Sequence, residues 1–313
     1  MFSKYKYVYQ VYKDRSFTKA AESLFIAQPS LSTAIKNIES KVGTELFERT
    51  GSGVNLTQAG EAYILAAEKI IALENELNQR LNDIQNLECG EISVGGSNYM
   101  SSYVLPKIIN KFKASHPKIT VTLVEAHSAD LLDFLKQDKV DVIVDSLGDT
   151  DDYVGYPLVR ERIFLCVNKQ STANQGLEEY QILPEDIHKG TAKPDKVKPV
   201  PISKFKSEKF VLLKQGNDMY QRATALFKKH KINPDIDFMV DQLSISYALT
   251  DSGVGASFIT DTFIKHANFK DNVYLYNLDE RFCYRPLCIA HKKNKYISRA
   301  IAEFIQTATE TIK

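Results

Sequence analysis

Apolar residues recur at helical spacing over the first part of the chain and predict three short helices. The first would bury a stripe made of Tyr5, Val8, Val11 and Tyr12. The second, over residues 19–24, follows Ser16 or Thr18, either of which offers a capping hydroxyl. The third starts at Pro29, whose missing amide hydrogen is tolerated in a first helical turn, and Gly43 ends it. It would bury Leu31, Ile35, Ile38 and Val42.

The third predicted helix carries short polar side chains at its leading end and on its outer surface. These are Gln28, Ser30, Ser32, Thr33 and Lys36. Amides and hydroxyls match the donors and acceptors of base edges in a major groove, and a lysine suits guanine or phosphate. A solvated polar face on an ordinary three-helix domain fits the same pattern, so the helices alone leave both alternatives open.

A hairpin is predicted next, because apolar pairs bracket a glycine-containing tip within residues 46–56. Arg49 lies near its base, where a cation suits a phosphate or a narrow minor groove. A weak surface ion pair with Glu45 or Glu48 is the alternative role for this arginine. A ribbon beside a polar helix favours DNA binding over a plain three-helix domain.

With these elements in place, the segment resembles the winged helix-turn-helix of the LysR-type transcriptional regulators. The resemblance rests on motifs that stand at the family's spacing without a gap: Ser16-Phe17-Thr18, Ala20-Ala21, Leu24, Gln28-Pro29-Ser30-Leu31-Ser32, Ile35, Leu46-Phe47-Glu48-Arg49 and Leu56-Thr57-Gln58-Ala59-Gly60. It implies that the family's DNA-contacting positions are Gln28, Pro29, Ser30, Thr33, Lys36 and Arg49. Thr33 departs from the arginine of many members, which leaves the operator sequence open. The resemblance spans essentially the whole chain but is specific only through residue 60.

A narrow apolar stripe predicts one long helix from Thr57, as its N-cap, to about Leu87. The stripe consists of Ala59, Tyr63, Ala66, Ile70, Leu73, Leu77, Ile84 and Leu87, and Arg80 interrupts it. Such a stripe either packs within its own domain or pairs with a second copy of the helix. We favour pairing into a homodimer, which the resemblance also implies, together with tetramers.

Strand and helix patterns alternate beyond Gly90 and predict a doubly wound α/β region. The expected elements are strands at 91–95, 119–125, 140–144, 163–167, 210–213, 236–240 and 255–259, helices at 105–114 and 129–137, and two strands and a closing helix within 273–313. A chain of 313 residues exceeds what one core usually organises.

We therefore predict three parts: a winged helix-turn-helix at 1–60, a linker helix at 61–89 and an effector-binding regulatory domain at 90–313. The resemblance implies that the last part is two-lobed and similar in fold to periplasmic solute-binding proteins. Lobe I is expected at 90–165 and 268–313 and lobe II at 166–267. The predicted crossings between the lobes lie near Val167-Asn168 and near His266–Phe269.

Candidate ligand-binding residues follow the predicted strands, where a cleft between two lobes would bring them together. They are Ser97, Asn98, Tyr99 and Met100 after the first strand, Ser128 after the second, Asp145 and Ser146 after the third, and Gln242 and Ser244 at a helix start in the other lobe. Tyr99, Met100 and Ile202 would hold an apolar part of the ligand. The resemblance favours Ser97 and Ser128, and then the segment that contains Ile202 and Ser203. Hydroxyls and helix-start amides favour an organic acid or an amino-acid-like anion, whereas Asp145 would repel a second carboxylate or attract an amine.

Charge and the absence of certain motifs reduce the number of function classes that fit the sequence. Residues 1–60 hold 8 Lys+Arg against 5 Asp+Glu, whereas the remainder holds 32 against 34. A net charge of +3 is small for DNA binding, so a dimer that doubles the phosphate contacts is expected. The sequence has no phosphate-loop, dinucleotide-binding, nucleophile-elbow or metal-ligand spacing, which argues against an enzyme, a cofactor and a metal. The four cysteines form no C-x-x-C pair, and no run approaches a membrane span.

The sequence thus predicts a ligand-responsive transcriptional regulator in the cytoplasm that binds a double-stranded DNA operator as a homodimer or tetramer. A small-molecule effector in the cleft would change DNA binding, and RNA polymerase is a further candidate partner. The alternative is a solute-binding or sensor protein whose N-terminal helices serve only for dimerisation.

Overall fold

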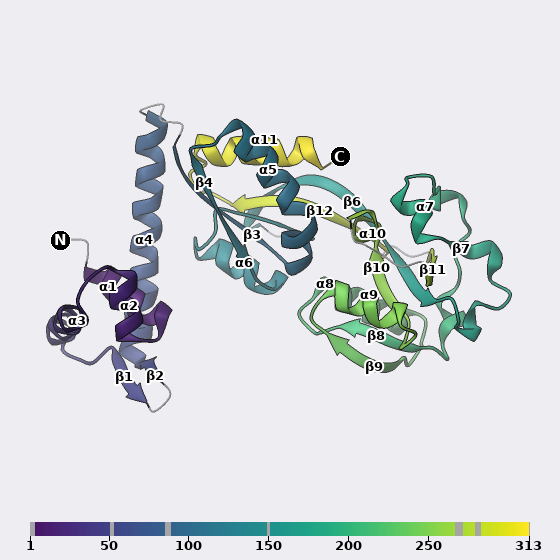
Figure 1. Ribbon diagram of the computed structural model, residues 1–313, viewed down its shortest axis with the longest axis horizontal. Helices are drawn as coiled ribbons and strands as arrows, with labels where there is room; N and C mark the ends of the chain where they lie inside the picture. Colours follow the sequence, from purple (N-terminus) through teal and green to yellow (C-terminus); the bar gives the residue numbers. More distant parts are fainter. Residues whose placement is uncertain are drawn as a thin grey trace. The chain divides into compact units, whose positions relative to one another are not determined.

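The computed structural model describes residues 4–50, 53–84, 89–148, 151–266, 272–278 and 283–312. The chain forms two compact units, one containing residues 1–85 and the other nearly all of residues 86–313 (Figure 1). Each unit is described by itself below.

The first unit contains three short helices, a hairpin and a long helix. They are α1 (Lys4–Asp14), α2 (Phe17–Ser23), α3 (Gln28–Val42), β1 (Phe47–Thr50), β2 (Gly53–Leu56) and α4 (Gln58–Ile84). Ser16 caps α2 by accepting a hydrogen bond from the Lys19 amide at 3.4 Å, and Gly43 ends α3 with a φ of 84°. The predicted helices and hairpin are therefore confirmed.

The core of the first unit confirms most of the predicted apolar positions. Buried residues include Tyr5, Val8, Val11, Ala20, Ala21, Leu31, Ile35 and Ile38. Tyr12 and Val42, which we expected to be buried, are 38% and 46% exposed. Each lies in the last turn of its helix, beyond the last residue of that helix that enters the core.

The start of α4 lies close against the hairpin. The Thr57 hydroxyl accepts a hydrogen bond from the Gly60 amide at 3.0 Å and donates one to the Glu45 carbonyl at 2.7 Å. A Cβ atom on Gly60 would lie 2.0 Å from the Leu46 carbonyl oxygen. The glycine of the Leu56–Gly60 motif is thus required by the close approach of helix and strand.

Gly60→Ala should lower the free energy of unfolding of the first unit by about 3 kcal/mol, because the backbone must move to admit the methyl group. Alanine is intrinsically the better helix former by about 1 kcal/mol, so the steric cost opposes a favourable change. Urea unfolding measures the effect, and Glu61→Ala at the next, exposed position is the control. A Gly60→Ala protein as stable as wild type would contradict the close packing.

The predicted apolar stripe of α4 enters the core only near the start of the helix. Ala59 and Tyr63 pack against the core, whereas Ala66 of the stripe is exposed. Ile64 and Ala67, which the predicted stripe did not include, are buried instead. Farther along, large apolar side chains are exposed: Ile70 at 36%, Leu73 at 67%, Leu77 at 56% and Leu81 at 45%. The predicted end of the helix at Leu87 and the side chain of Ile84 lie outside the described residues.

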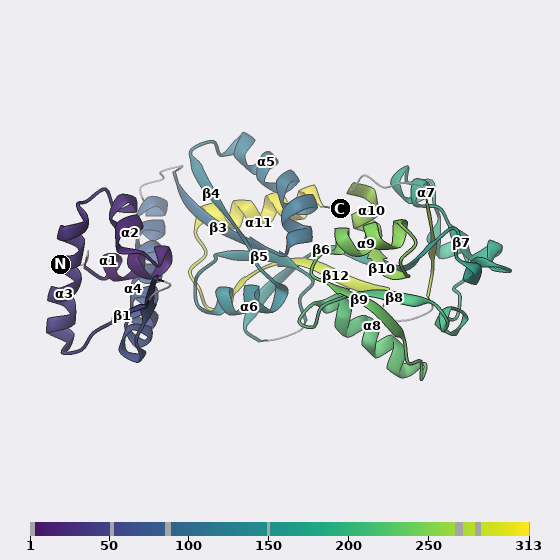
Figure 2. The same cartoon turned by 60° about the horizontal axis from the view of Figure 1, so that its bottom comes forward.

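The second unit is built on an eight-stranded sheet with the order β4-β3-β5-β12-β6-β11-β7, in which β10 also pairs with β6 (Figure 2). The strands are β3 (Gly90–Gly96), β4 (Ile119–Glu125), β5 (Val142–Asp145), β6 (Tyr153–Asn168), β7 (Gln181–Ile182), β10 (Ser257–Thr260), β11 (Val273–Tyr276) and β12 (Tyr284–Lys292). A separate parallel pair joins β8 (Lys209–Leu213) to β9 (Asp235–Val240).

Helices cover both faces of the first part of the sheet. The helices of this unit are α5 (Leu105–Ser115), α6 (Ser128–Lys136), α7 (Pro184–His188), α8 (Asp218–Lys229), α9 (Leu243–Asp251), α10 (Asp261–His266) and α11 (Arg299–Thr311), with a π turn at Met100–Val104 and short 3-10 turns at Thr172–Asn174, Glu178–Tyr180, Pro194–Lys196 and Ile202–Phe205. Val142 and Val144 share a core with α5 and α11, whereas Ile143 between them packs with α6. This arrangement confirms the predicted α/β class, and the closing helix returns to the first lobe.

One long strand, β6, joins the two lobes. Its residues up to Arg162 pair with β12, and those from Ile163 pair with β10 and β11. The chain therefore enters lobe II at Arg162–Ile163 and returns to lobe I between Tyr276 and Tyr284.

The observed crossings differ from the predicted ones near Val167-Asn168 and His266–Phe269. The apolar run 163–167 looks like a separate strand in the sequence, but it continues the more exposed strand that starts at Tyr153. β11 follows the second predicted crossing and still pairs with the lobe II end of β6. Residues 267–271 lie outside the described residues.

Candidate functional site

The polar residues of α3 lie on the surface, opposite its buried side. Leu31, Ile35 and Ile38 are at most 5% exposed. Pro29, Ser30, Thr33 and Lys36 are exposed, and Gln28 and Ser32 are half-buried. The separation of faces expected from the sequence is therefore present.

Hydrogen bonds along α3 orient two of these side chains. Gln28 Nε2 donates to Ser32 Oγ at 2.9 Å, and Thr33 Oγ1 donates to the Pro29 carbonyl at 2.9 Å. Lys36 forms no ion pair with any described residue, so its charge is available to a partner.

The hairpin is fastened to α3 by a carboxylate. Glu39 Oε1 accepts hydrogen bonds from the amides of Leu46 at 2.9 Å and Phe47 at 3.4 Å. Arg49 lies on β1 opposite Val54, and its side chain is outside the described structure. The wing and the polar helix surface thus form one positioned element.

A second feature is a cavity of about 510 Å³ in the second unit, between its two lobes. Lobe I contributes Ser97, Asn98, Tyr99, Glu125, Ala126, His127, Ser128, Asp130, Asp145 and Arg285 to the lining. Lobe II contributes Leu213, Asn217, Met219, Asp241, Gln242 and Leu243. The volume suits a small organic molecule.

The cavity brings together six of the eleven residues predicted to bind an effector: Ser97, Asn98, Tyr99, Ser128, Asp145 and Gln242. The loops after β3, β4 and β5 lie at one edge of the sheet, as expected, because the carboxyl ends of parallel strands lie at the same edge.

Five predicted residues do not line the cavity. Met100 and Ile202 are 0% and 2% exposed and belong to the hydrophobic core. Ser203 lies on an exposed turn, and Ser146 is 8% exposed and does not line the cavity, although its amide binds Asp145. Ser244 lies one residue too far into α9, because Gln242 and Leu243 already fill the wall at the helix start.

Asp145 is a buried carboxylate in the cavity wall, with 2% of its surface exposed. Its Oδ2 accepts a hydrogen bond from the Ser128 hydroxyl at 2.7 Å, and its Oδ1 accepts one from the Ser146 amide at 2.7 Å. Burial raises the pKa of Asp145, while the hydrogen bond from Ser128 and the charge of Arg285 act in the opposite direction.

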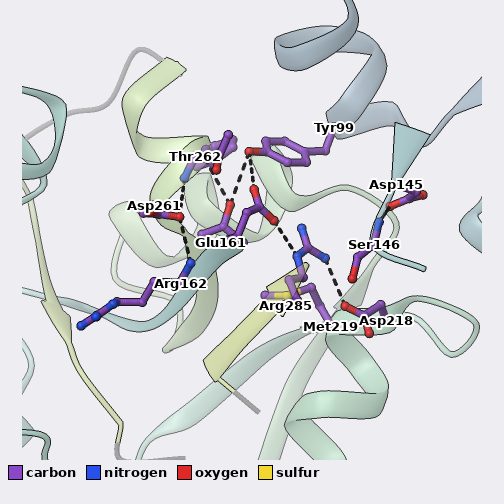
Figure 3. A network of polar contacts seen from close by, with 12 residues as sticks. Tyr99, Asp145, Ser146, Glu161, Arg162, Asp218, Met219, Asp261, Thr262 and Arg285 are labelled. Carbon is purple, nitrogen blue, oxygen red and sulfur yellow. Dashed lines mark hydrogen bonds and ion pairs between the residues drawn. The ribbon is translucent and has the colours of Figure 1, made fainter. Parts of the chain in front are cut away.

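The floor of the cavity is a network of buried charges (Figure 3). Arg285 Nε donates to Glu161 Oε2 at 2.6 Å, and Tyr99 donates its hydroxyl hydrogen to Glu161 Oε1 at 3.0 Å. Arg285 and Glu161 are direct partners in the pairing of β12 with β6. Burial lowers the pKa of Arg285, but the Glu161 and Asp218 carboxylates outweigh it and raise the pKa above its usual value.

The same arginine reaches across the two lobes. Arg285 Nη1 lies 3.3 Å from Asp218 Oδ2, at the start of α8 in lobe II. Asp218 is also held by Arg222 Nε at 2.8 Å. The contact between Arg285 and Asp218 therefore links the lobes at the base of the cavity.

Sequence reasoning missed several lining residues, above all Arg285 and the acids Glu125, Asp130 and Asp241. Arg285 left one trace, a cation near the start of a largely apolar strand pattern at 284–292 that also holds His291 and Lys292. The three acids look like ordinary surface residues in the sequence, and only the fold places them at one cavity.

The described part of the chain holds neither a cluster of His, Cys, Asp or Glu side chains that could bind a metal ion nor a helix able to cross a membrane.

Comparison with known proteins gives two family matches. The family described as "Bacterial regulatory helix-turn-helix protein, lysR family" matches residues 2–61, and "LysR substrate binding domain" matches residues 85–313. The chain is 28% identical over 309 residues to an uncharacterized HTH-type transcriptional regulator of Bacillus subtilis, YcgK, with 98% of this chain and 94% of YcgK covered.

Solved structures share the fold. Full-length CbnR in complex with its target DNA superposes with a TM-score of 0.69 at 20% identity and 99% coverage of both chains. A full-length variant of OxyR from Pseudomonas aeruginosa gives a TM-score of 0.68 at 20% identity, covering 98% of this chain and 94% of that one.

Proposed function

The chain belongs to the LysR family of DNA-binding transcriptional regulators, which are not enzymes, and we propose that a small molecule in the interlobe cavity changes its binding to an operator. The observation that carries the operator contact is the exposed polar surface of α3, which lies beside a wing fixed by Glu39. Gln28, Pro29, Ser30, Ser32, Thr33, Lys36 and Arg49 are the proposed DNA contacts. The alternative was a solute-binding or sensor protein whose N-terminal helices serve only for dimerisation. The match of residues 2–61 to a DNA-binding helix-turn-helix family argues against it.

A homodimer joined through α4 is part of this proposal. The exposed side chains of Ile70, Leu73, Leu77 and Leu81 form an apolar strip that water covers in a single chain. Such a strip favours a second copy of the helix as its cover, since both copies then remove the same apolar surface from water. We also propose tetramers and a cytoplasmic location, where a chromosomal operator is reached.

The cavity supplies a means of regulation. The lobes are linked at its base by Arg285 and Asp218, and a ligand that contacts both lobes would favour one of their arrangements. DNA affinity changes only if the two arrangements of the lobes place the two α3 helices of a dimer differently. This coupling between lobe arrangement and α3 position is part of the proposal. The division into residues 1–60, 61–89 and 90–313 is retained as part of the proposal.

Gln28→Ala should weaken operator binding by about 1–3 kcal/mol without unfolding the protein, because the amide is suited to bidentate contact with a base. Fluorescence anisotropy at fixed salt, on DNA fragments identified by genomic footprinting, measures the change. Ser40→Ala, at an exposed position at the far end of the same helix, is the control. Equal operator affinities of the wild type and Gln28→Ala would show that Gln28 does not contribute to operator binding.

A further inference from the structure

The charged residues that line the interlobe cavity are mostly acids. Glu125, Asp130, Asp145 and Asp241 face one lining arginine, Arg285. Among the described residues, only the last of these four acids has an ion-pair partner, since Lys214 Nζ lies 2.7 Å from Asp241. Glu125 accepts a hydrogen bond from the neutral amide of Asn98 at 3.1 Å, which leaves its charge uncompensated.

The lining arginine already binds two carboxylates. Its guanidinium is bound to Glu161 at 2.6 Å and to Asp218 at 3.3 Å, and its side chain is 6% exposed. A ligand carboxylate at this guanidinium would be the third to share its single positive charge, with the buried Asp145 carboxylate in the same cavity wall. Repulsion between these negative charges disfavours such binding.

The Asp145 carboxylate, in contrast, would be stabilised by a cation. This carboxylate is 2% exposed and receives hydrogen bonds from the Ser128 hydroxyl and the Ser146 amide, both of them neutral donors, and Ser97 lines the same cavity. A buried carboxylate is stabilised most by a cation in direct contact. An ammonium group has three donor hydrogens, which match this carboxylate and the adjacent hydroxyl oxygens.

We propose, building on the function proposed above, that the effector carries a protonated amino group that binds at Asp145, between Ser97 and Ser128. The effector class is thus an amine or an amino acid rather than a simple organic acid or a dicarboxylate. This drops the simple organic acid among the ligands expected from the sequence and keeps the amino-acid-like ligand and the amine, because the sequence did not reveal the other acids of the lining or the carboxylates bound to Arg285.

A series of four-carbon compounds tests the charge requirement with the full-length protein. Butylamine, putrescine and γ-aminobutyrate carry an ammonium group, whereas butyrate and succinate carry carboxylates only. Thermal unfolding and titration calorimetry at millimolar concentration should show binding and a raised Tm with the three amino compounds and with neither acid. Tighter binding of γ-aminobutyrate than of butylamine would identify an amino acid, and the reverse order a simple amine.

Asp145→Asn should weaken the binding of the amino compounds about 10- to 100-fold, the loss expected for one charge-assisted hydrogen bond. Asp133→Asn makes the same change at an exposed position of α6 outside the cavity and should leave that binding unaltered. The ranking of the five compounds on wild type is decisive even if Asp145→Asn does not fold.

Stronger binding of butyrate or succinate than of the amino compounds would overturn the inference, as would no binding of any amino compound or undiminished binding to Asp145→Asn. DNA binding of wild type, measured separately without ligand, distinguishes this failure from failure of the regulator proposal. Intact DNA binding with preference for the acids would reject only the amine.

Discussion

Arg285→Met should destabilise the second unit by about 3–5 kcal/mol, because it leaves a buried carboxylate without its cation. Glu161 is 0% exposed and lies 2.6 Å from the arginine. Tyr99 would still donate its hydrogen bond, but a neutral donor compensates less than a guanidinium. Urea unfolding followed by circular dichroism measures the loss.

Two further proteins make that measurement specific. Arg299→Met removes an arginine whose side chain is 68% exposed and should cost less than about 0.5 kcal/mol. The double variant with Glu161→Leu and Arg285→Met should recover most of the lost stability, because the buried carboxylate that Arg285→Met leaves without its cation is then also removed. A single Arg285→Met variant as stable as wild type would show that water or another residue already compensates Glu161.

The DNA-reading part was predictable because its pattern is local. Leu31, Ile35 and Ile38 recur at helical spacing, and the polar face follows directly once these three are buried. Helix starts and ends also depend on adjacent residues, such as Ser16 and Gly43. The local sequence pattern could not predict that the later part of the α4 stripe is exposed. That exposure depends on where the short helices stop covering the long helix.

The cavity between the two lobes was predictable only in part. Ser97, Ser128 and Asp145 follow successive strands of one sheet, so the strand-end rule places them together. Arg285 comes from an antiparallel strand much later in the chain, and the pairing register of β12 with β6 sets its place. The sequence does not specify such a register, nor that Asp218 of the other lobe meets the same guanidinium.

Replacing Leu73 and Leu77 together by lysine should convert the protein to a monomer and lower its operator affinity by about 10²–10⁴-fold. The factor is the avidity lost when two linked reading domains become one. Both side chains are more than half exposed in the single chain, at 67% and 56%, so lysine should cost little folding stability. Sedimentation analysis reports the assembly, and fluorescence anisotropy with operator DNA reports the affinity.

The matched control replaces Asn75 and Asn78 by lysine, which adds the same charge in the same turns of α4 at exposed polar positions. This protein should remain dimeric and bind DNA at least as well as wild type, because two added cations favour phosphate contact. Comparing the two double variants separates the loss of the apolar strip from the gain of charge. A Leu73 and Leu77 double variant that stays dimeric would mean that another surface holds the subunits together, and the long helix would then position the reading domains without joining them.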